Sequence, residues 1–226
     1  MKTFFIVVLS MLLSVAIAQA QDFREALSKL RQEYEQTENF HIAMQVKVFD
    51  EQGAAKPYFN EQVIIRRSGL RYLYRFGNSE MLMNEKYIVL VDRGSREIVC
   101  NKRSLKAEKE TFKDMARLNV IDSVLRMYGT PEYLGKTAAG DDHYRVQQKK
   151  GDIRDVDLFI NPQTHLLTAL HYQYRTRQFV TIAFDRFDVR PVFGADTFSE
   201  TQYVISNRGT LGASPAFKNY TVLAAK

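Results

Sequence analysis

The sequence lacks most of the features that would cross-link the chain or anchor it in a membrane. Cys100 is the only cysteine among 226 residues, which excludes an intrachain disulfide and leaves stability to a packed core. Its apolar neighbours Ile98 and Val99 indicate a structural thiol in a buried strand. No stretch after residue 20 approaches the roughly 18 continuous apolar residues that a membrane-spanning helix needs. We therefore expect a soluble mature chain with neither a span nor a lipid anchor.

Motifs of known chemistry are also missing. The sequence contains no Gly-x-Ser-x-Gly and no Gly-rich phosphate loop, and Cys100 has no identifiable base. His165 and His171 are six residues apart, about 20 Å along a strand and too far to share an ion, while His41 and His143 lack ligand partners at diagnostic spacing. We predict no catalytic residues, no metal and no cofactor. Paired carboxylates on a β-rich scaffold would escape this search, so a hydrolase with dispersed residues stays an alternative.

Charge is modest and scattered. Lysine and arginine number 32 against 26 acidic residues, a formal net charge of +6. No basic run coincides with an RNA- or DNA-binding motif, so we expect no nucleic acid partner. The positive charge fits a face toward anionic lipids or an acidic partner, or simply a solvated surface.

Residues 1–20 have the pattern of a secretory signal peptide, with Lys2, an apolar core and Ala18-Gln19-Ala20 before the cleavage point. Its removal takes away Lys2 and no acidic residue, changing the net charge from +6 to +5. Downstream, Phe23, Leu27, Leu30 and Tyr34 recur at helical spacing and predict an amphipathic helix that packs on a sheet.

The stretch from Val63 to Arg103 predicts an antiparallel meander, because short apolar segments alternate with tight polar or glycine-bearing breaks. It follows an alternating first strand at 40–49 and a second at 60–67. From Leu70 to Phe76 the even-numbered residues share one face, whereas Tyr87–Val91 is apolar on both faces.

This stretch resembles the core of the periplasmic outer-membrane lipoprotein carriers, the LolA/LolB-like family. In that family a strand ends in Lys/Arg-Arg-Pro, an aromatic strand follows, and a later strand reads Asp-Gly-Lys-x-Leu-Trp-x-Tyr-Asp. Here the second strand ends in Arg66-Arg67-Ser68-Gly69, and residues 86–92, KYIVLVD, occur in the matching order. Ser68, Glu85 and Ile88 stand where the family has proline, glycine and an aromatic residue, so the cargo stays open.

Beyond the meander, residues 104–128 have a broken helical periodicity that predicts one helix interrupted near Asn119, or two short ones. In the resembled family this segment is a movable lid, whereas from the residues alone it is equally a permanent plug. Strands are expected at 143–149, 156–160, 166–174 and 179–187. Residues 205–226 are expected to form a loop, followed by an edge strand or tail at TVLAA.

Several strands carry bulky residues on both faces, so the sheet is expected to curve around either a core of side chains or a cavity for an acyl chain. We predict an α+β fold: a strongly curved antiparallel sheet that forms an incomplete, half-open β-barrel covered by helices. The domains would be a signal peptide (1–20), a carrier domain (21–204) and the C-terminal segment (205–226). Predicted lipid-binding residues are Met44, Val46, Tyr72, Tyr74, Met81, Met83, Ile88, Leu90, Leu158, Leu170, Tyr172 and Phe184.

The resemblance implies a non-catalytic, monomeric periplasmic carrier. It would bind the acyl chains of a lipoprotein or other lipid and move them from an inner-membrane donor complex to an outer-membrane acceptor. Phe112 and Met115 would belong to the lid, and Arg67 would be either a rim residue that bonds a head group or the lid, or a solvated charge at a strand end. The alternative is a periplasmic sensor or protein-interaction module on the same scaffold.

Overall fold

The structure is a computed structural model that describes residues 23–34, 37–104, 131–148, 150–207 and 210–224. The predicted signal peptide lies outside the described residues. So does nearly all of the predicted central helical segment, including Phe112 and Met115. Within the described residues, one α-helix is present, at 23–34, and no helix is long and apolar enough to cross a membrane.

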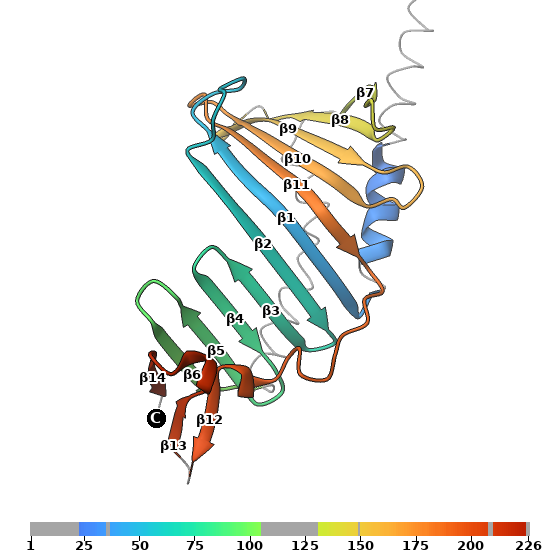
Figure 1. Cartoon of the computed structure of the whole chain (residues 1–226). Helices are drawn as coiled ribbons and strands as arrows, with labels where there is room; N and C mark the ends of the chain where they lie inside the picture. Colours follow the sequence, from blue (N-terminus) through green and yellow to red (C-terminus); the bar gives the residue numbers. More distant parts are fainter. Residues whose placement is uncertain (1–22, 35–36, 105–130, 149, 208–209, 225–226) are drawn as a thin grey trace, which may run out of the picture. The chain divides into compact units, whose positions relative to one another are not determined.

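About half of the described residues belong to one sheet of twelve strands (Figure 1). In spatial order these are β14 (Thr221–Ala224), β6 (Glu97–Lys102), β5 (Tyr87–Asp92), β4 (Ser79–Met83), β3 (Arg71–Phe76), β2 (Phe59–Ser68), β1 (Asn39–Phe49), β11 (Phe179–Asp188), β10 (Leu167–Tyr174), β9 (Ile153–Ile160), β8 (Asp142–Gln147) and β7 (Glu132–Lys136). β12 (Val204–Asn207) and β13 (Thr210–Ala213) form a separate pair, flanked by the short 3₁₀ helices η1 (Glu200–Gln202) and η2 (Pro215–Phe217). The order has two ends, β14 and β7, so the sheet is open.

The predicted antiparallel meander is confirmed as β2–β6. Gly69 has a φ of +59° in the turn between β2 and β3, a conformation that glycine adopts without steric cost. Leu70 was predicted to share the face of Tyr72, but it lies in this turn and is 49% exposed.

The strands of the second half are confirmed as β8–β11, with β9 beginning three residues earlier than predicted. β7 was missed. The stretch 207–220, predicted to be a loop, contains β13 and η2. The predicted edge strand is confirmed for Thr221–Ala224, β14, which pairs with β6 in parallel.

The chain divides into two compact units. Unit 1 comprises Met1–Gln36, Val46–Asn60 and Val120–Phe184, and unit 2 comprises Thr37–Gln45, Glu61–Asn119 and Asp185–Lys226. Each is described by itself below. The single carrier domain over 21–204 and the half-open barrel stay predictions.

In unit 1 the helix packs against β8 and β9. Phe23 is 2% exposed and its ring centroid lies 5.2 Å from that of Tyr144. Ala26 and Leu27 contact the same cluster, as the helical spacing predicted. Tyr34 was predicted on this stripe, but its side chain is largely exposed. The helix therefore uses its first two turns for packing.

Candidate functional site

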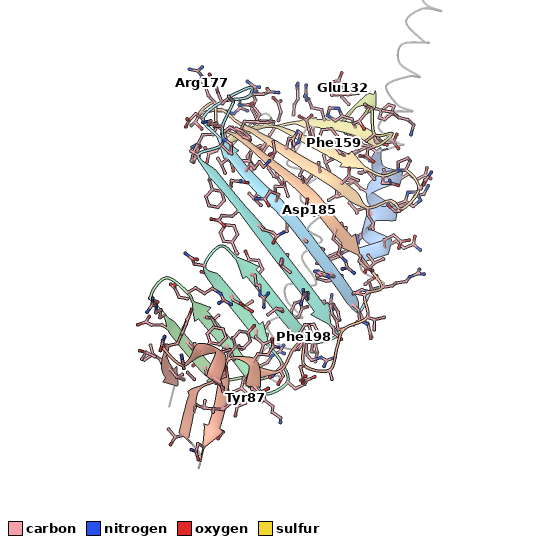
Figure 2. All side chains as sticks on the ribbon, in the orientation of Figure 1. Tyr87, Glu132, Phe159, Arg177, Asp185 and Phe198 are labelled. Carbon is pink, nitrogen blue, oxygen red and sulfur yellow. The ribbon has the colours of Figure 1, made fainter. Side chains whose placement is uncertain are left out.

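In unit 2, β3–β6 have two faces that differ in how they are covered. On the first face Leu73, Leu82, Val89 and Cys100 lie directly opposite one another across four strands, and none is more than 2% exposed. The C-terminal part of the chain packs on this face with Phe198, Tyr203, Val204 and Phe217; Figure 2 labels Phe198. These residues form a close-packed core of the chain's own side chains.

A buried carboxylate fixes the C-terminal segment on that core. Glu80 accepts hydrogen bonds from the phenol of Tyr203 and from Arg93, the latter at 2.9 Å. It also forms an ion pair with Arg75, whose Nε is 2.9 Å from the carboxylate. Burial by itself raises the pKa of the Glu80 carboxyl, but these bonds outweigh it and hold the pKa below its usual value. Nothing in the sequence pattern indicated the contact with Tyr203, because the two residues are 123 positions apart.

Asn84 makes a second polar attachment at the turn between β4 and β5. Its amide nitrogen donates to Phe198 O at 3.2 Å and to Glu200 at 2.7 Å, while its amide oxygen accepts from the backbone N–H groups of Lys86 and Tyr87. All of its bonding groups are therefore in use, and the turn and η1 are held together.

The opposite face of β2–β6 carries six of the predicted lipid-binding residues in two adjacent rows. One row places Tyr72, Met83 and Ile88 directly opposite one another. The next row places Tyr74, Met81 and Leu90 in the same relation. Leu90 is 43% exposed and the other five are partly buried. We call this surface the apolar face.

Two apolar residues that were not predicted complete the second row. Ile65 lies opposite Tyr74, and Val99 lies opposite Leu90. Cross-strand neighbours have Cβ atoms about 4.5–5.5 Å apart, so these five residues form one continuous strip. Strand alternation determines which face of the sheet Ile65 and Val99 occupy. Only the pairing of the strands in the structure shows that these two residues extend the strip.

Arg67 lies on the apolar face at the β2 end of the first row, opposite Tyr72. Its guanidinium carbon is 5.5 Å from the Tyr72 ring centroid and 5.9 Å from that of Phe40, within range of a cation–π interaction. Its Nε donates to Gly69 O at 3.1 Å. Arg67 is therefore a half-buried cation held against aromatic rings, rather than a fully solvated charge. Its role at a rim stays a prediction.

The remaining predicted residue of unit 2 is Met44. Phe40 and Ile42, both buried, precede it on β1 at the two-residue spacing of a strand. Since Phe40 contacts Arg67, this side of β1 continues the apolar face.

In unit 1 the predicted residues lie on the face that the helix covers. Leu158 packs against the cluster of Phe23 and Tyr144 and lies opposite Leu170. Tyr172 shares the face of Leu170, as strand alternation requires. On β11, Ile182 lies opposite Leu170, and Phe184, two residues further along, is on the same face as Ile182. Val46 on β1 is partly buried. No single site emerges from these residues in the structure of unit 1.

The other face of unit 1 has a polar and aromatic ladder that the sequence did not reveal. His143 packs on Phe159, Phe159 on His171, and His171 on Phe179, with centroid separations of 4.4, 4.7 and 5.5 Å (Figure 2 labels Phe159). The rings pack against one another, so the ladder mainly stabilises the sheet.

Buried Asp157 lies beside this ladder. Arg145 bonds it through two nitrogens, at 2.8 and 3.1 Å, and the His143 ring nitrogen is 3.0 Å away. Burial favours the neutral acid, yet the bonds from Arg145 and His143 hold the pKa of Asp157 below its usual value. Among the described residues, no group of three or more histidine, cysteine, aspartate or glutamate side chains is arranged to hold a metal ion.

Comparison with known proteins gives fold-level neighbours only. No family model matches the sequence, and none of the curated proteins matches it. Solved structures similar to the chain include the Pseudomonas aeruginosa MucA/MucB complex, with 12% identity, a TM-score of 0.46 and coverage of 79% of this chain and 60% of that one. The chain therefore spans less than two thirds of that neighbour's length.

Two other neighbours are described as lipoprotein-related. They are the Mycobacterium tuberculosis lipoprotein LppX, with 9% identity, a TM-score of 0.42 and coverage of 75% of this chain and 96% of that one, and a putative outer membrane lipoprotein-sorting protein domain from Vibrio parahaemolyticus, with 7% identity, a TM-score of 0.35 and coverage of 82% and 97%. At these levels of similarity, function has to be argued from the residues of this chain.

Proposed function

We propose that this protein is a non-catalytic periplasmic carrier that binds the acyl chains of lipoproteins or other lipids on the apolar face of unit 2. It would receive them from an inner-membrane donor complex and deliver them to an outer-membrane acceptor. The observation that carries the proposal is that the two faces of β3–β6 are covered differently. One face is filled by the chain's own C-terminal segment, whereas the other presents two rows of partly exposed apolar side chains.

The chemistry of these rows suits a flexible chain. Met81 and Met83 are unbranched and adaptable, and the rings of Tyr72 and Tyr74 offer flat apolar area. Each CH₂ group moved from water onto such a surface contributes about 0.8 kcal/mol. A shallow face with adaptable residues would hold a chain and still release it, as a carrier requires.

The test is native mass spectrometry of the protein purified from a periplasmic extract, with lipid extraction, for the wild type and Met83→Asp. A charge in the middle of the first row should abolish retention of lipid, because an ionised carboxylate beside an acyl chain loses its hydration. Ser79→Asp is the matched control, since Ser79 lies on the same strand and the same face but outside both rows.

Lipid bound to the wild type and to Ser79→Asp, but not to a folded Met83→Asp, supports the carrier and identifies its cargo class. A clean apo mass together with no uptake of a fluorescent fatty acid overturns it. The apolar face would then be assigned to a protein partner, as in the alternative of a periplasmic interaction module.

A further inference from the structure

Asn101 is a polar residue in the first row of the apolar face. It lies directly opposite Ile88, which continues the row to Met83, Tyr72 and finally Arg67. Neighbouring strands are about 4.8 Å apart. The row therefore has an amide at one end and a cation at the other, separated by four strand spacings and joined by apolar side chains.

The amide oxygen of Asn101 is buried and has no hydrogen-bond partner among the described residues. A buried acceptor without a donor is unfavourable, and such groups are uncommon in folded proteins. Asn84, 17 positions earlier and also buried, has both its amide oxygen and its amide nitrogen bonded. The amide oxygen of Asn101 therefore differs from that of Asn84 in that no described residue donates a hydrogen bond to it.

We propose, on the basis of the carrier function above, that Asn101 recognises the polar junction of the lipid by accepting a hydrogen bond from a group next to the acyl chain. The ligand class is then an acylated molecule with an N–H or O–H at that junction, such as an N-acyl amide or an acylglycerol. A simple ester or an ionised fatty acid has no proton to donate there. The acyl chain would run along the row toward Arg67.

The experiment compares ligands that differ only at this junction. Dissociation constants are measured by displacement of the fluorescent probe N-phenyl-1-naphthylamine with N-methyl lauramide, N,N-dimethyl lauramide and methyl laurate. Wild-type protein should bind the N-methyl amide more tightly than the other two compounds. In Asn101→Leu the ratio of the dissociation constants should shrink by about fivefold, the value of one ordinary hydrogen bond. Asn219→Leu, at an exposed asparagine between η2 and β14, is the control and should keep it.

Monolaurin separates the two sources of the donor. If an acylglycerol hydroxyl serves, Asn101→Leu weakens monolaurin binding as it weakens N-methyl lauramide binding. If only the amide is affected, the ligand class narrows to N-acylated molecules. Both results support recognition by Asn101.

The remaining outcomes distinguish a failure of the inference about Asn101 from a failure of the carrier function. If all lauryl compounds bind but the preference is the same in wild type and Asn101→Leu, the inference about Asn101 is wrong while the carrier function stands. If no lauryl compound displaces the probe and none is taken up, the carrier function itself fails. Circular dichroism and urea unfolding check that Asn101→Leu is folded. If it is not, equal wild-type affinities for the N-methyl and N,N-dimethyl amides overturn the inference without any variant.

Discussion

The phenol of Tyr203 donates a hydrogen bond to the buried carboxylate of Glu80, joining residues 123 positions apart in the sequence. This contact holds the C-terminal segment on one face of β3–β6, whereas the apolar face is the surface on which we propose that a ligand binds. The two faces should therefore respond differently to mutation.

Tyr203→Phe removes the hydroxyl while keeping the ring that packs against Phe217. The buried Glu80 then loses one of its two hydrogen-bond donors, and we expect a loss of about 1–3 kcal/mol in the free energy of unfolding. Urea denaturation monitored by circular dichroism measures it. Tyr58→Phe is the matched control, because the Tyr58 hydroxyl accepts from Gln178 at an exposed position, and its effect should stay below about 0.5 kcal/mol. Equal losses in the two variants would refute this account of Tyr203.

Acid should weaken unit 2 through Glu80. Its pKa is lower in the folded protein than the ordinary value of 4.5, so the unfolded chain binds the proton more tightly. The stabilisation is complete above about pH 4.5 and is lost as the pH falls through the lower folded value. Unfolding free energies measured from pH 6 to pH 3 should decline less steeply in Glu80→Gln than in the wild type. A parallel decline in both would show that other groups control the acid response.

We expect protonation of His171 to lower the folding stability at a milder pH than protonation of Glu80 does. Burial lowers the pKa of its imidazole from the ordinary 6.5, against the raising effect of Asp157, while the nearby His143 lowers it further. The neutral ring is favoured in the folded state, so stability is complete above about pH 6.5 and declines as the pH drops toward the folded pKa. His171→Phe should reduce this decline while keeping the ladder packed.

The control for His171 is His165→Asn. His165 has a φ of +58°, which asparagine tolerates, and it lies outside the ladder. Unfolding midpoints between pH 7.5 and 5 should fall as in the wild type for His165→Asn and less for His171→Phe. An unchanged slope in His171→Phe would exclude the ladder histidine as the cause.

Alanine substitutions on the two faces of β3–β6 should affect stability and lipid binding differently. Leu82→Ala creates a cavity at a residue that is fully buried in the core and should cost about 2–5 kcal/mol of stability. Leu90→Ala, one strand away on the apolar face and 43% exposed, should cost less than about 1 kcal/mol but weaken lipid binding. Thermal unfolding and probe displacement on the same samples measure both quantities. Stability loss without a binding defect in Leu90→Ala would argue against the apolar face as the site.

The sequence was sufficient for the parts of the fold that depend on local pattern. Short alternating segments with polar breaks predicted β2–β6, and alternation placed Tyr72 and Tyr74 on one face before the register was known. The polar break at 84–86 predicted the turn between β4 and β5, whereas the pairing of Met83 with Ile88 is known from the structure. The helix was recognisable from Phe23 and Leu27, although Tyr34 at its end is exposed.

Features that depend on distant contacts were not predictable in this way. Tyr203 and Phe217 lie in a stretch with weak periodicity and are buried only because β3–β6 offer them a surface. The register of β9 on β8 places Asp157 beside Arg145 and His143, a contact that the sequence pattern did not indicate. The orphaned oxygen of Asn101 likewise depends on the surroundings of one atom, which no residue pattern encodes.

The parallel pairing of β14 with β6 has a consequence for how the chain is assembled. Thr221 pairs with Glu97, roughly 120 residues earlier, so β6 is synthesised long before its outer neighbour exists. Until β14 arrives, β6 presents an unpaired backbone edge of the kind that recruits other chains. Synthesis from the amino end thus leaves a period of exposure in which aggregation through this edge competes with folding.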